Sequence, residues 1–345
     1  MEIVSQVLSI LAALLLLSIF VMVHEYGHYK AGKLLGFTIL EFAIGMGPKL
    51  ASWEKNGTLY AIRLFPIGGM CRFYGEDEGV KDGKSFNAQK AWKRFIVLFS
   101  GPLMNIVSAL LFAIVALTAY GDFAAGVGDV PNTTSPAYLA GIRPGDVLYA
   151  VNGAPIEYPE DARAKILAVR EDEAVITVLR NGEQLDLKVE NIYNEELGEN
   201  QIGINIASVR VTYPFFEAIR ASFSYVGSII RDMFAFLGGM FTRGVQPNDV
   251  AGPVGTISII GSAVRMGLEV VLRLSVMLSV NLGIINLLPI PGLDGARIGF
   301  VAAEGIRGKA VSPEKEGMVH FIGIILLVGL IIFLTFNDIK RLLGG

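Results

Sequence analysis

Four segments of the sequence are apolar over lengths that can cross a lipid bilayer, and this constrains the fold more than any other feature. A helix needs about 20 residues to cross roughly 30 Å of hydrocarbon. The apolar windows are Ile3–Val23, Phe95–Tyr120, Leu274–Leu293 and about Met318–Phe336. Hydrophobic residues make up 52% of the 345 residues, and their concentration in blocks favours a membrane protein over a large soluble core. We predict a polytopic α-helical membrane protein with about four transmembrane helices.

The first window is not typical of a cleaved signal peptide. The chain begins with Met1-Glu2 rather than a basic segment, and no small-residue cleavage pattern follows the apolar run. We therefore expect a retained membrane span.

A fifth apolar region, Phe215–Phe241, is interrupted by charges. Glu217, Arg220, Arg231 and Asp232 lie within it, and charges are costly at the bilayer centre. We expect a helix that lies in the membrane interface or packs on the protein.

Lysine and arginine residues predict the orientation. They are frequent between the first two windows, and Arg297, Arg307, Lys309 and Lys315 lie between the last two. Positively charged loops face the cytoplasm in most membrane proteins. The region from Gly121 to about Arg273 is then extracytoplasmic. Lys340 and Arg341 oppose this assignment slightly.

The outside region contains a compact domain over about Asp122–Val211. Alternating segments adjoin Asn152-Gly153 and Asn181-Gly182, dipeptides typical of tight hairpin turns. Asp161–Val169 favours a short helix, so we predict a small β-rich barrel with one or two helices. The predicted division is membrane core at 1–121, this domain at 122–211, an amphipathic helical linker at 212–265 and membrane core at 266–345.

Composition excludes several classes of function. The net charge of −3 shows no basic excess for nucleic acid. The single cysteine, Cys71, excludes an internal disulfide framework and a zinc site built from several cysteines. The chain has only three histidines, His24, His28 and His320.

Two of these histidines end the first apolar window in the motif HEYGH. His24 and His28 are four residues apart, which places both imidazoles on one helix face, able to hold one metal ion. Glu25 lies beside them and can accept a proton from metal-bound water. The alternative is a hydrated histidine pair at the membrane surface.

The third ligand that a catalytic zinc requires is not adjacent in sequence. Asp294 is the strongest candidate, because it follows the third window in NLLPIPGLDG. Pro289 and Pro291 interrupt the helix there, and irregular backbone at membrane depth is tolerated only beside protein or a water-filled cavity. The alternative for Asp294 is a solvated helix cap. His320 is predicted to be an interfacial residue rather than a ligand.

The pairing of HEYGH with NLLPIPGLDG resembles the site-2 protease family of intramembrane zinc metalloproteases. The resemblance implies that His24, His28 and Asp294 bind Zn²⁺ and that Glu25 is the general base. It also implies that the asparagine–proline motif lies beside the substrate, together with Asn105 of the block SGPLMN. The motif residues are Asn286, Pro289 and Pro291. The blocks GMGP (Gly45–Pro48) and AGPVG (Ala251–Gly255) also resemble the family.

The outside domain resembles a PDZ domain of the bacterial protease type through SPAYLAGIRPGDVLYAVNG. This places the chain in the branch of the bacterial regulator of sigma-E protease, with one PDZ-like domain rather than two. The expected peptide groove is formed by Leu139, Ala140, Gly141 and Ile142. The alternative is a folded spacer that binds no peptide.

A segment between the first two spans, Thr58–Gly75, alternates like a strand and is expected to turn at Gly68-Gly69. The resemblance implies a cytoplasmic-side β-hairpin that dips into the membrane and pairs with an extended substrate. A hairpin on the cytoplasmic surface is the alternative.

The implied activity is intramembrane proteolysis of single-span membrane proteins already cut outside, with anti-sigma factors or signal peptide remnants as possible substrates. The implied location is the inner membrane of a bacterium, with the active site towards the cytoplasm. Three other functions remain open at this point: a membrane-anchored binding protein with a structural metal, a transporter with proline-broken spans, and an outward-facing zinc peptidase.

Overall fold

The structure, a computed structural model, describes residues 2–76, 82–156, 159–180, 182–190, 192–194, 199–244, 250–309 and 311–343. It divides into two compact units. Unit 1 comprises Met1–Ala116 and Ala218–Gly345, and unit 2 comprises Leu117–Glu217.

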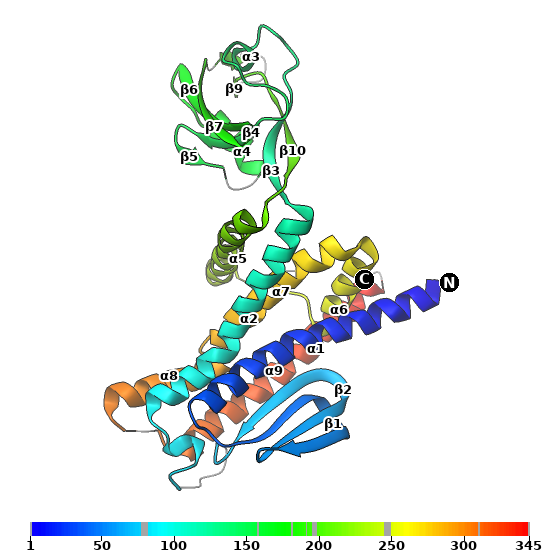
Figure 1. Cartoon of the computed structure of the whole chain (residues 1–345), viewed down its shortest axis with the longest axis vertical. Helices are drawn as coiled ribbons and strands as arrows, with labels where there is room; N and C mark the ends of the chain where they lie inside the picture. Colours follow the sequence, from blue (N-terminus) through cyan, green and yellow to red (C-terminus); the bar gives the residue numbers. More distant parts are fainter. Residues whose placement is uncertain are drawn as a thin grey trace. The chain divides into compact units, whose positions relative to one another are not determined.

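Unit 1 consists mainly of long helices with one pair of long strands (Figure 1). In chain order the elements are α1 (Glu2–Leu34), β1 (Ile39–Lys55), β2 (Thr58–Phe73), the 3-10 helix Phe86–Ala88, α2 (Ala91–Tyr120), α5 (Phe215–Arg243), α6 (Pro253–Met266), α7 (Leu268–Leu287), α8 (Asp294–Arg307) and α9 (Pro313–Leu342). The ends of α2 and α5 extend into unit 2.

Four helices in the described part of the chain are long and apolar enough to cross a membrane. They are Gln6–Leu34, Ala91–Tyr120, Leu268–Leu287 and Glu314–Arg341. Each of the four apolar windows therefore forms a helix over most of its length, which supports an integral, polytopic membrane protein. Most of the apolar side chains of α9 are exposed, as expected for a helix in contact with lipid.

The third span ends where the prolines predict a break. Helix α7 stops at Leu287, and Leu288 has an extended backbone with φ −66° and ψ 143°. The Gly292 N–H donates a hydrogen bond to His320 Nδ1 of α9 over 3.0 Å. Helix α8 then begins at Asp294, so the break places this carboxylate at a helix start instead of inside a span.

Helix α5 is not one of the candidate membrane spans found in the described residues. It packs against other helices of unit 1. Its Val226 is buried in a cluster with residues of α2 and α7. The buried partners are Ala109, Ala113, Val276, Val280 and Ile284. The charged residues that interrupt this segment in sequence are compatible with such a helix, because only one of its faces is covered.

Strands β1 and β2 form the hairpin, but its turn differs from the predicted one. The turn is at Asn56-Gly57, where both residues have positive φ, 53° and 70°, as a tight Asn-Gly hairpin turn requires. Gly69 instead lies inside β2 and pairs with Ile44. The chain nevertheless bends back between Ile62 and Gly69, which both pair with Ile44, and Gly68 in this bend has φ 86°. The predicted change of direction near Gly68-Gly69 is therefore a bend within β2, whereas the turn that joins the two strands is at Asn56-Gly57.

The hairpin strands are bent, so that one segment of β1 has partners on two sides. Glu41–Ile44 pairs with Gly69–Arg72 and also with Leu59–Ile62. The pairing leaves Gly69–Phe73 at an edge of this sheet. A Cβ on Gly69 would lie 3.2 Å from Val21 Cγ1 of α1, which places the edge directly against the first span.

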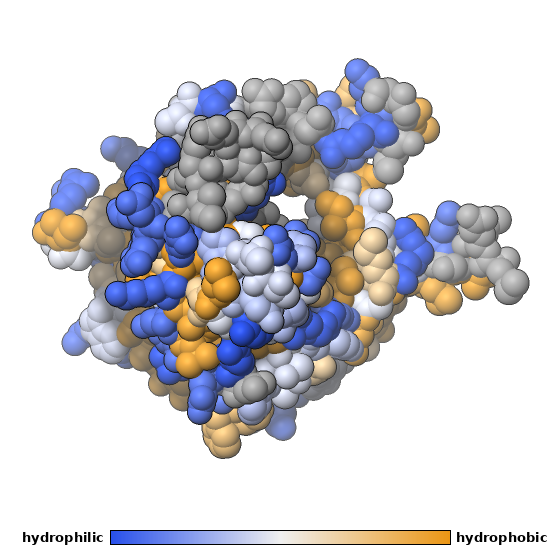
Figure 2. All heavy atoms as spheres, turned by 90° about the horizontal axis from the view of Figure 1, so that it is seen from above, coloured by the Kyte–Doolittle hydropathy of each residue, from blue (hydrophilic) through white to orange (hydrophobic). Residues whose placement is uncertain are grey.

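Unit 2 is a β-rich domain with its own hydrophobic core. Its elements are β3 (Asp122–Asp129), α3 (Pro136–Leu139), β4 (Val147–Val151), β5 (Ala154–Pro155), α4 (Pro159–Leu167), β6 (Glu173–Arg180), β7 (Glu183–Glu190), β8 (Ile192–Asn194), β9 (Glu199–Gln201) and β10 (Asn205–Val211). The main sheet has the order β10-β3-β4-β6-β7, with β5 beside β4. Figure 2, which draws the whole molecule from above, shows hydrophilic and hydrophobic residues mixed over the visible surface.

Two Asn-Gly dipeptides in unit 2 predict hairpin turns, and the one that the structure describes in full is a turn. Asn152 and Gly153 have φ 47° and 77° and connect β4 with β5. Asn181 of the second signal lies outside the described residues, although β6 and β7 pair in register on either side of it.

A buried carboxylate joins α9 to the start of α6. Asp338 accepts hydrogen bonds from the backbone N–H groups of Gly252, over 3.2 Å, and Gly255, over 2.7 Å. Asp338 is buried, and a Cβ on either glycine would lie within 3 Å of its oxygens. The sequence block AGPVG is thus a helix start that receives a cap from a different helix.

We expect Asp338→Ala to lower the stability of the protein by about 1–3 kcal/mol, because two N–H groups at a buried helix start would lose their acceptor. Thermal unfolding in detergent would measure the effect, with Asp338→Asn giving an intermediate loss. Glu54→Ala, at an exposed site of β1, is the control. Equal unfolding temperatures for Asp338→Ala and the control would contradict the capping role.

Candidate metal centre

Three metal-binding side chains from distant parts of the sequence converge in unit 1. His24 and His28 lie one turn apart on α1, with their Nε2 atoms 3.2 Å apart. The Asp294 Oδ2 atom lies 3.0 Å from His24 Nε2 and 3.3 Å from His28 Nε2. The ligand atoms of all three residues lie within 4.8 Å of one another.

These residues fit a divalent cation. Asp294 Oδ2 is buried and forms no hydrogen bond within the described structure, so one of its lone pairs is available to a metal. Two imidazole nitrogens and one carboxylate oxygen form a ligand set typical of catalytic zinc, which keeps a further position open for water or substrate. Both histidines are buried, as a centre shielded from bulk water requires.

A backbone carbonyl fixes the tautomer of His28. Its Nδ1 lies 2.8 Å from the Val97 carbonyl oxygen of α2. Because a carbonyl only accepts, Nδ1 carries the proton and Nε2 keeps its lone pair for the metal. Such outer contacts orient the ring and increase the basicity of the ligand.

Asn105 contacts the Nδ1 atom of His24, as the Val97 carbonyl contacts that of His28. Its side-chain amide lies 3.1 Å from His24 Nδ1, and its Oδ1 atom is buried without a partner in the described structure. If the amide is turned so that Oδ1 faces His24, Oδ1 accepts the Nδ1 proton and Nε2 is freed for metal. Asn105 was expected beside the substrate, but it is fully buried against a ligand.

The close crossing of α1 and α2 brings these contacts together. A Cβ on Gly27 would lie 2.2 Å from the Ser100 carbonyl oxygen, and one on Gly101 would lie 2.3 Å from His28 Nε2. The Ser100 hydroxyl also donates to the Gly27 carbonyl over 2.9 Å. Glycine at both positions lets the helix carrying the histidines rest directly on α2. Sequence reasoning missed Gly101, although it belongs to the block SGPLMN.

Glu25 lines the same cavity as the three ligands. The cavity has a volume of about 260 Å³. Its other walls come from the edge of β2, from α2 and from α8, and its lining residues besides the ligands and Glu25 are Gly69, Met70, Cys71, Arg72, Phe73, Glu76, Leu98 and Arg297. A Cβ on Gly69 would lie 2.8 Å from Glu25 Cγ, and the Cys71 backbone forms a hydrogen bond with the Glu25 carboxylate.

Cys71 also faces this cavity. Burial raises the pKa of its thiol well above the usual range, and the nearby carboxylate of Glu25 adds to the effect. The group of side chains close enough to share one metal ion comprises His24, His28 and Asp294 and does not include Cys71.

The other residues of the asparagine–proline motif lie away from the cavity lining. The Asn286 amide donates to the Leu282 carbonyl of its own helix over 2.9 Å. Pro289 is exposed, and Pro291 packs so closely on α9 that a Cβ on Gly323 would lie 2.3 Å from its Cβ. Gly68 has φ +86° and lies against Met46 of the hairpin.

The four residues expected to form a peptide groove in unit 2 are engaged in other contacts. The backbone N–H groups of Leu139, Ala140, Gly141 and Ile142 donate to carbonyls of residues 135–138. Ile142 is fully buried in the core of the unit, whereas Leu139 is exposed. These N–H groups are therefore not available to a peptide, because the segment forms α3 and its C-terminal turn.

Comparison with known proteins decides the family. The profile described as peptidase family M50 matches residues 12–330. The chain belongs to peptidase family M50, the site-2 protease family. The zinc metalloprotease RasP of Shouchella clausii is 33% identical, with 97% of this chain and 99% of the relative covered. RasP of Oceanobacillus iheyensis is 30% identical, with 97% and 99% covered.

This protease is accordingly a zinc metalloprotease of the membrane. The family and the names of its relatives agree with the donor set that the fold assembles from His24, His28 and Asp294. The recognition of the family from two short motifs is confirmed, as are the enzyme class and Zn²⁺ as the cofactor.

We expect Gly101→Ala to weaken zinc binding by about 10–100-fold, because the added methyl group would displace the His28 ring from its contact with Val97. Zinc retained after dialysis against a graded chelator series would measure this. Gly299→Ala in α8 is the matched control, since a Cβ there would meet no atom within 4 Å. Retention equal to that of the control would contradict the packing argument.

Proposed function

We propose that this protease cleaves peptide bonds within the membrane segments of single-span proteins that have already been cut on the extracytoplasmic side. The observation that carries the proposal is the depth of the site. His24 and His28 lie inside the candidate span Gln6–Leu34, and Asp294 follows directly on the broken end of another span. A centre built on membrane-spanning helices can reach peptide bonds at the depth of the bilayer.

Glu25 is the proposed general base, and the three ligands are His24, His28 and Asp294. When bound, zinc polarises the scissile carbonyl and lowers the pKa of water to about 7. Glu25 accepts the proton of the attacking water and passes it to the leaving amine. The hydrogen bond with the Cys71 backbone and the contact with Gly69 hold its side chain at the cavity wall.

Asn105 is proposed as a positioning residue rather than a substrate contact. Its buried amide lies against His24 Nδ1, and no part of it lines the cavity of the metal centre. The side chain would act on the reaction through the orientation and basicity of His24.

The edge of β2 supplies a means of presenting the substrate. A helical peptide bond is shielded by its own hydrogen bonds, so the substrate must be extended before it is cut. Gly69–Phe73 lines the cavity and pairs with β1 on one side, so an extended substrate can add on the other side. Gly68, Gly69 and the motif residues Asn286, Pro289 and Pro291 are proposed to confine that segment.

The orientation follows from the positive-inside bias, with the metal centre towards the cytoplasm and unit 2 outside. In a bacterium the membrane is the inner membrane, and anti-sigma factors or signal peptide remnants are candidate substrates. Unit 2 is proposed to be PDZ-like. Its edge strand β10 pairs with β3 and contacts α4, so a peptide would add along β10 rather than at residues 139–142.

We expect Glu25→Gln to retain zinc but to lower the rate of cleavage by about 10²–10⁴-fold, because the amide cannot accept the proton. Asp294→Ala should lose both zinc and activity. Purified protein reconstituted with a single-span reporter, with metal analysis in parallel, measures both effects. Glu54→Gln in β1 is the control. Cleavage by Glu25→Gln at the wild-type rate would show that the base is assigned wrongly.

A further inference from the structure

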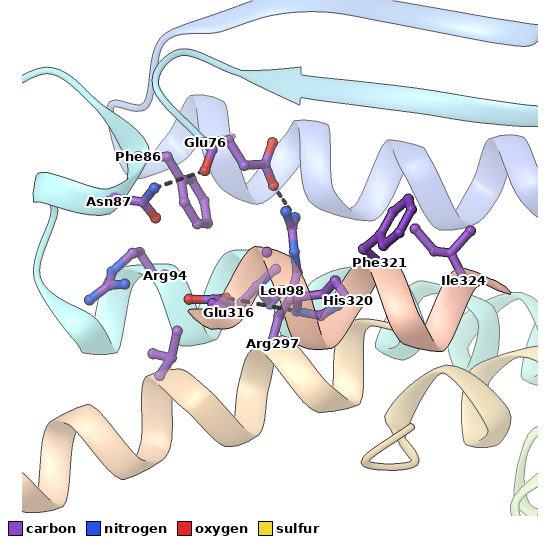
Figure 3. A pocket seen from close by; sticks show the side chains of 12 residues that line it. Glu76, Phe86, Asn87, Arg94, Leu98, Arg297, Glu316, His320, Phe321 and Ile324 are labelled. Atoms are coloured by element: carbon purple, nitrogen blue, oxygen red, sulfur yellow. Dashed lines mark hydrogen bonds and ion pairs between the residues drawn. The ribbon is translucent and has the colours of Figure 1, made fainter. Parts of the chain in front are cut away.

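Two cavities meet beside the metal centre. The first holds the ligands and Glu25. The second, also about 260 Å³, lies between α2, α8 and α9 and is lined in part by Phe321 and Ile324 (Figure 3). Glu76, Leu98 and Arg297 line both cavities. These three residues therefore form the partition between the catalytic cavity and its neighbour.

An ion pair forms the polar part of this partition. The Glu76 Oε1 atom pairs with Arg297 Nη1, and the Glu76 carboxylate is almost entirely buried while the Arg297 side chain is partly buried. Figure 3 shows the two side chains reaching towards each other, Glu76 from the segment after β2 and Arg297 from α8. Because α8 also carries Asp294, one helical turn before Arg297, the guanidinium has a fixed position relative to the ligands.

The same carboxylate also occupies the edge of β2. The Phe73 N–H donates to Glu76 Oε2 over 3.2 Å. Two residues earlier on this strand, the Cys71 backbone contacts Glu25. Alternate N–H groups of a strand point to the same side, about 6.6 Å apart for a two-residue step. Glu76 therefore binds the edge about two residues away from the proposed catalytic base.

The main chain of Glu76 is held separately from its side chain. Asn87 Nδ2 donates to the carbonyl of Gly75 over 3.1 Å and to that of Glu76 over 2.8 Å. Rotation of the Glu76 side chain alone can thus break both its hydrogen bond with the Phe73 N–H and its ion pair with Arg297. The backbone of the turn need not move.

We infer that the Phe73 N–H and the Arg297 guanidinium form a carboxylate-binding subsite of the substrate groove, which Glu76 occupies when no substrate is bound. The occupant during turnover is an aspartate or glutamate side chain of the substrate, about two residues from the bond that is cut. An Arg guanidinium and a backbone N–H are the donors that carboxylates prefer. Glu76 is then an internal competitor of the substrate, and Arg297 is a determinant of specificity. This inference rests on the proposed function.

The test compares the cleavage of single-span reporters that differ in one residue, with Glu or Gln two positions before or after the cut. For wild type we expect kcat/KM to be about 10-fold higher for the Glu reporter at one of these positions, as one charge-assisted hydrogen bond provides. Arg297→Gln should remove the preference, and Arg297→Lys should restore part of it. Glu76→Gln should raise kcat/KM for the Glu reporter several-fold, mainly through KM.

Arg273→Gln, which removes an arginine paired with Glu269 within α7, is the control for loss of an ion pair away from both cavities. Zinc content and unfolding temperature identify any variant that has lost its fold. If such loss affects Arg297→Gln, then Arg297→Lys, which keeps a positive charge opposite Glu76, tests the same contact through a reduced preference for the Glu reporter.

The outcomes separate this inference from the proposed function. Equal cleavage of the Glu and Gln reporters by wild type, or an unchanged preference in Arg297→Gln, overturns the subsite while leaving intramembrane proteolysis intact. Lower activity of Glu76→Gln on both reporters by the same factor overturns its role as a competitor. Cleavage of neither reporter by wild type under any condition contradicts the proposed function itself.

Discussion

The contact of the Asp294 carboxylate with the imidazoles of His24 and His28 joins two distant parts of the chain in unit 1. Asp294 lies near His24 and His28 at the start of α8, after a non-helical connection that follows the end of α7 at Leu287. The break releases backbone groups that must find partners away from bulk water. The contact of Gly292 with His320 of α9 supplies one of these partners, and Pro291 packs closely on Gly323 of the same helix.

Helix α2 contacts both histidine rings on the side away from Asp294. Val97 and Asn105 of α2 contact the outer nitrogens of His28 and His24. Both contacts depend on the tight crossing at Gly27 and Gly101, where no side chain separates the helices. The packing of α2 on α1 therefore affects the metal site directly. A shift of α2 would change the contacts that set the tautomer and direction of both rings.

The edge of β2 lines the same cavity as Glu25 and the three metal-binding candidates. An exposed strand edge attracts other strands, and proteins commonly protect such edges with charges. Here Glu76 covers part of the edge and is held by Arg297.

The sequence by itself determined the features that depend on local spacing. Four apolar windows predicted four helices of spanning length, the four-residue interval of HEYGH placed two imidazoles on one face, and the prolines of NLLPIPGLDG predicted the break before Asp294. The pairing of these motifs was also specific enough to indicate the family. Each of these conclusions follows from helix geometry or backbone chemistry within a few residues.

Only the tertiary structure decided which distant residues meet. It placed Asn105 behind His24, located the hairpin turn at Asn56-Gly57 and placed Gly69 against Glu25. It also joined Glu76 to Arg297, a pair that no periodicity links. Such contacts depend on how helices and strands pack across long loops, and a single sequence carries no local signal of that packing.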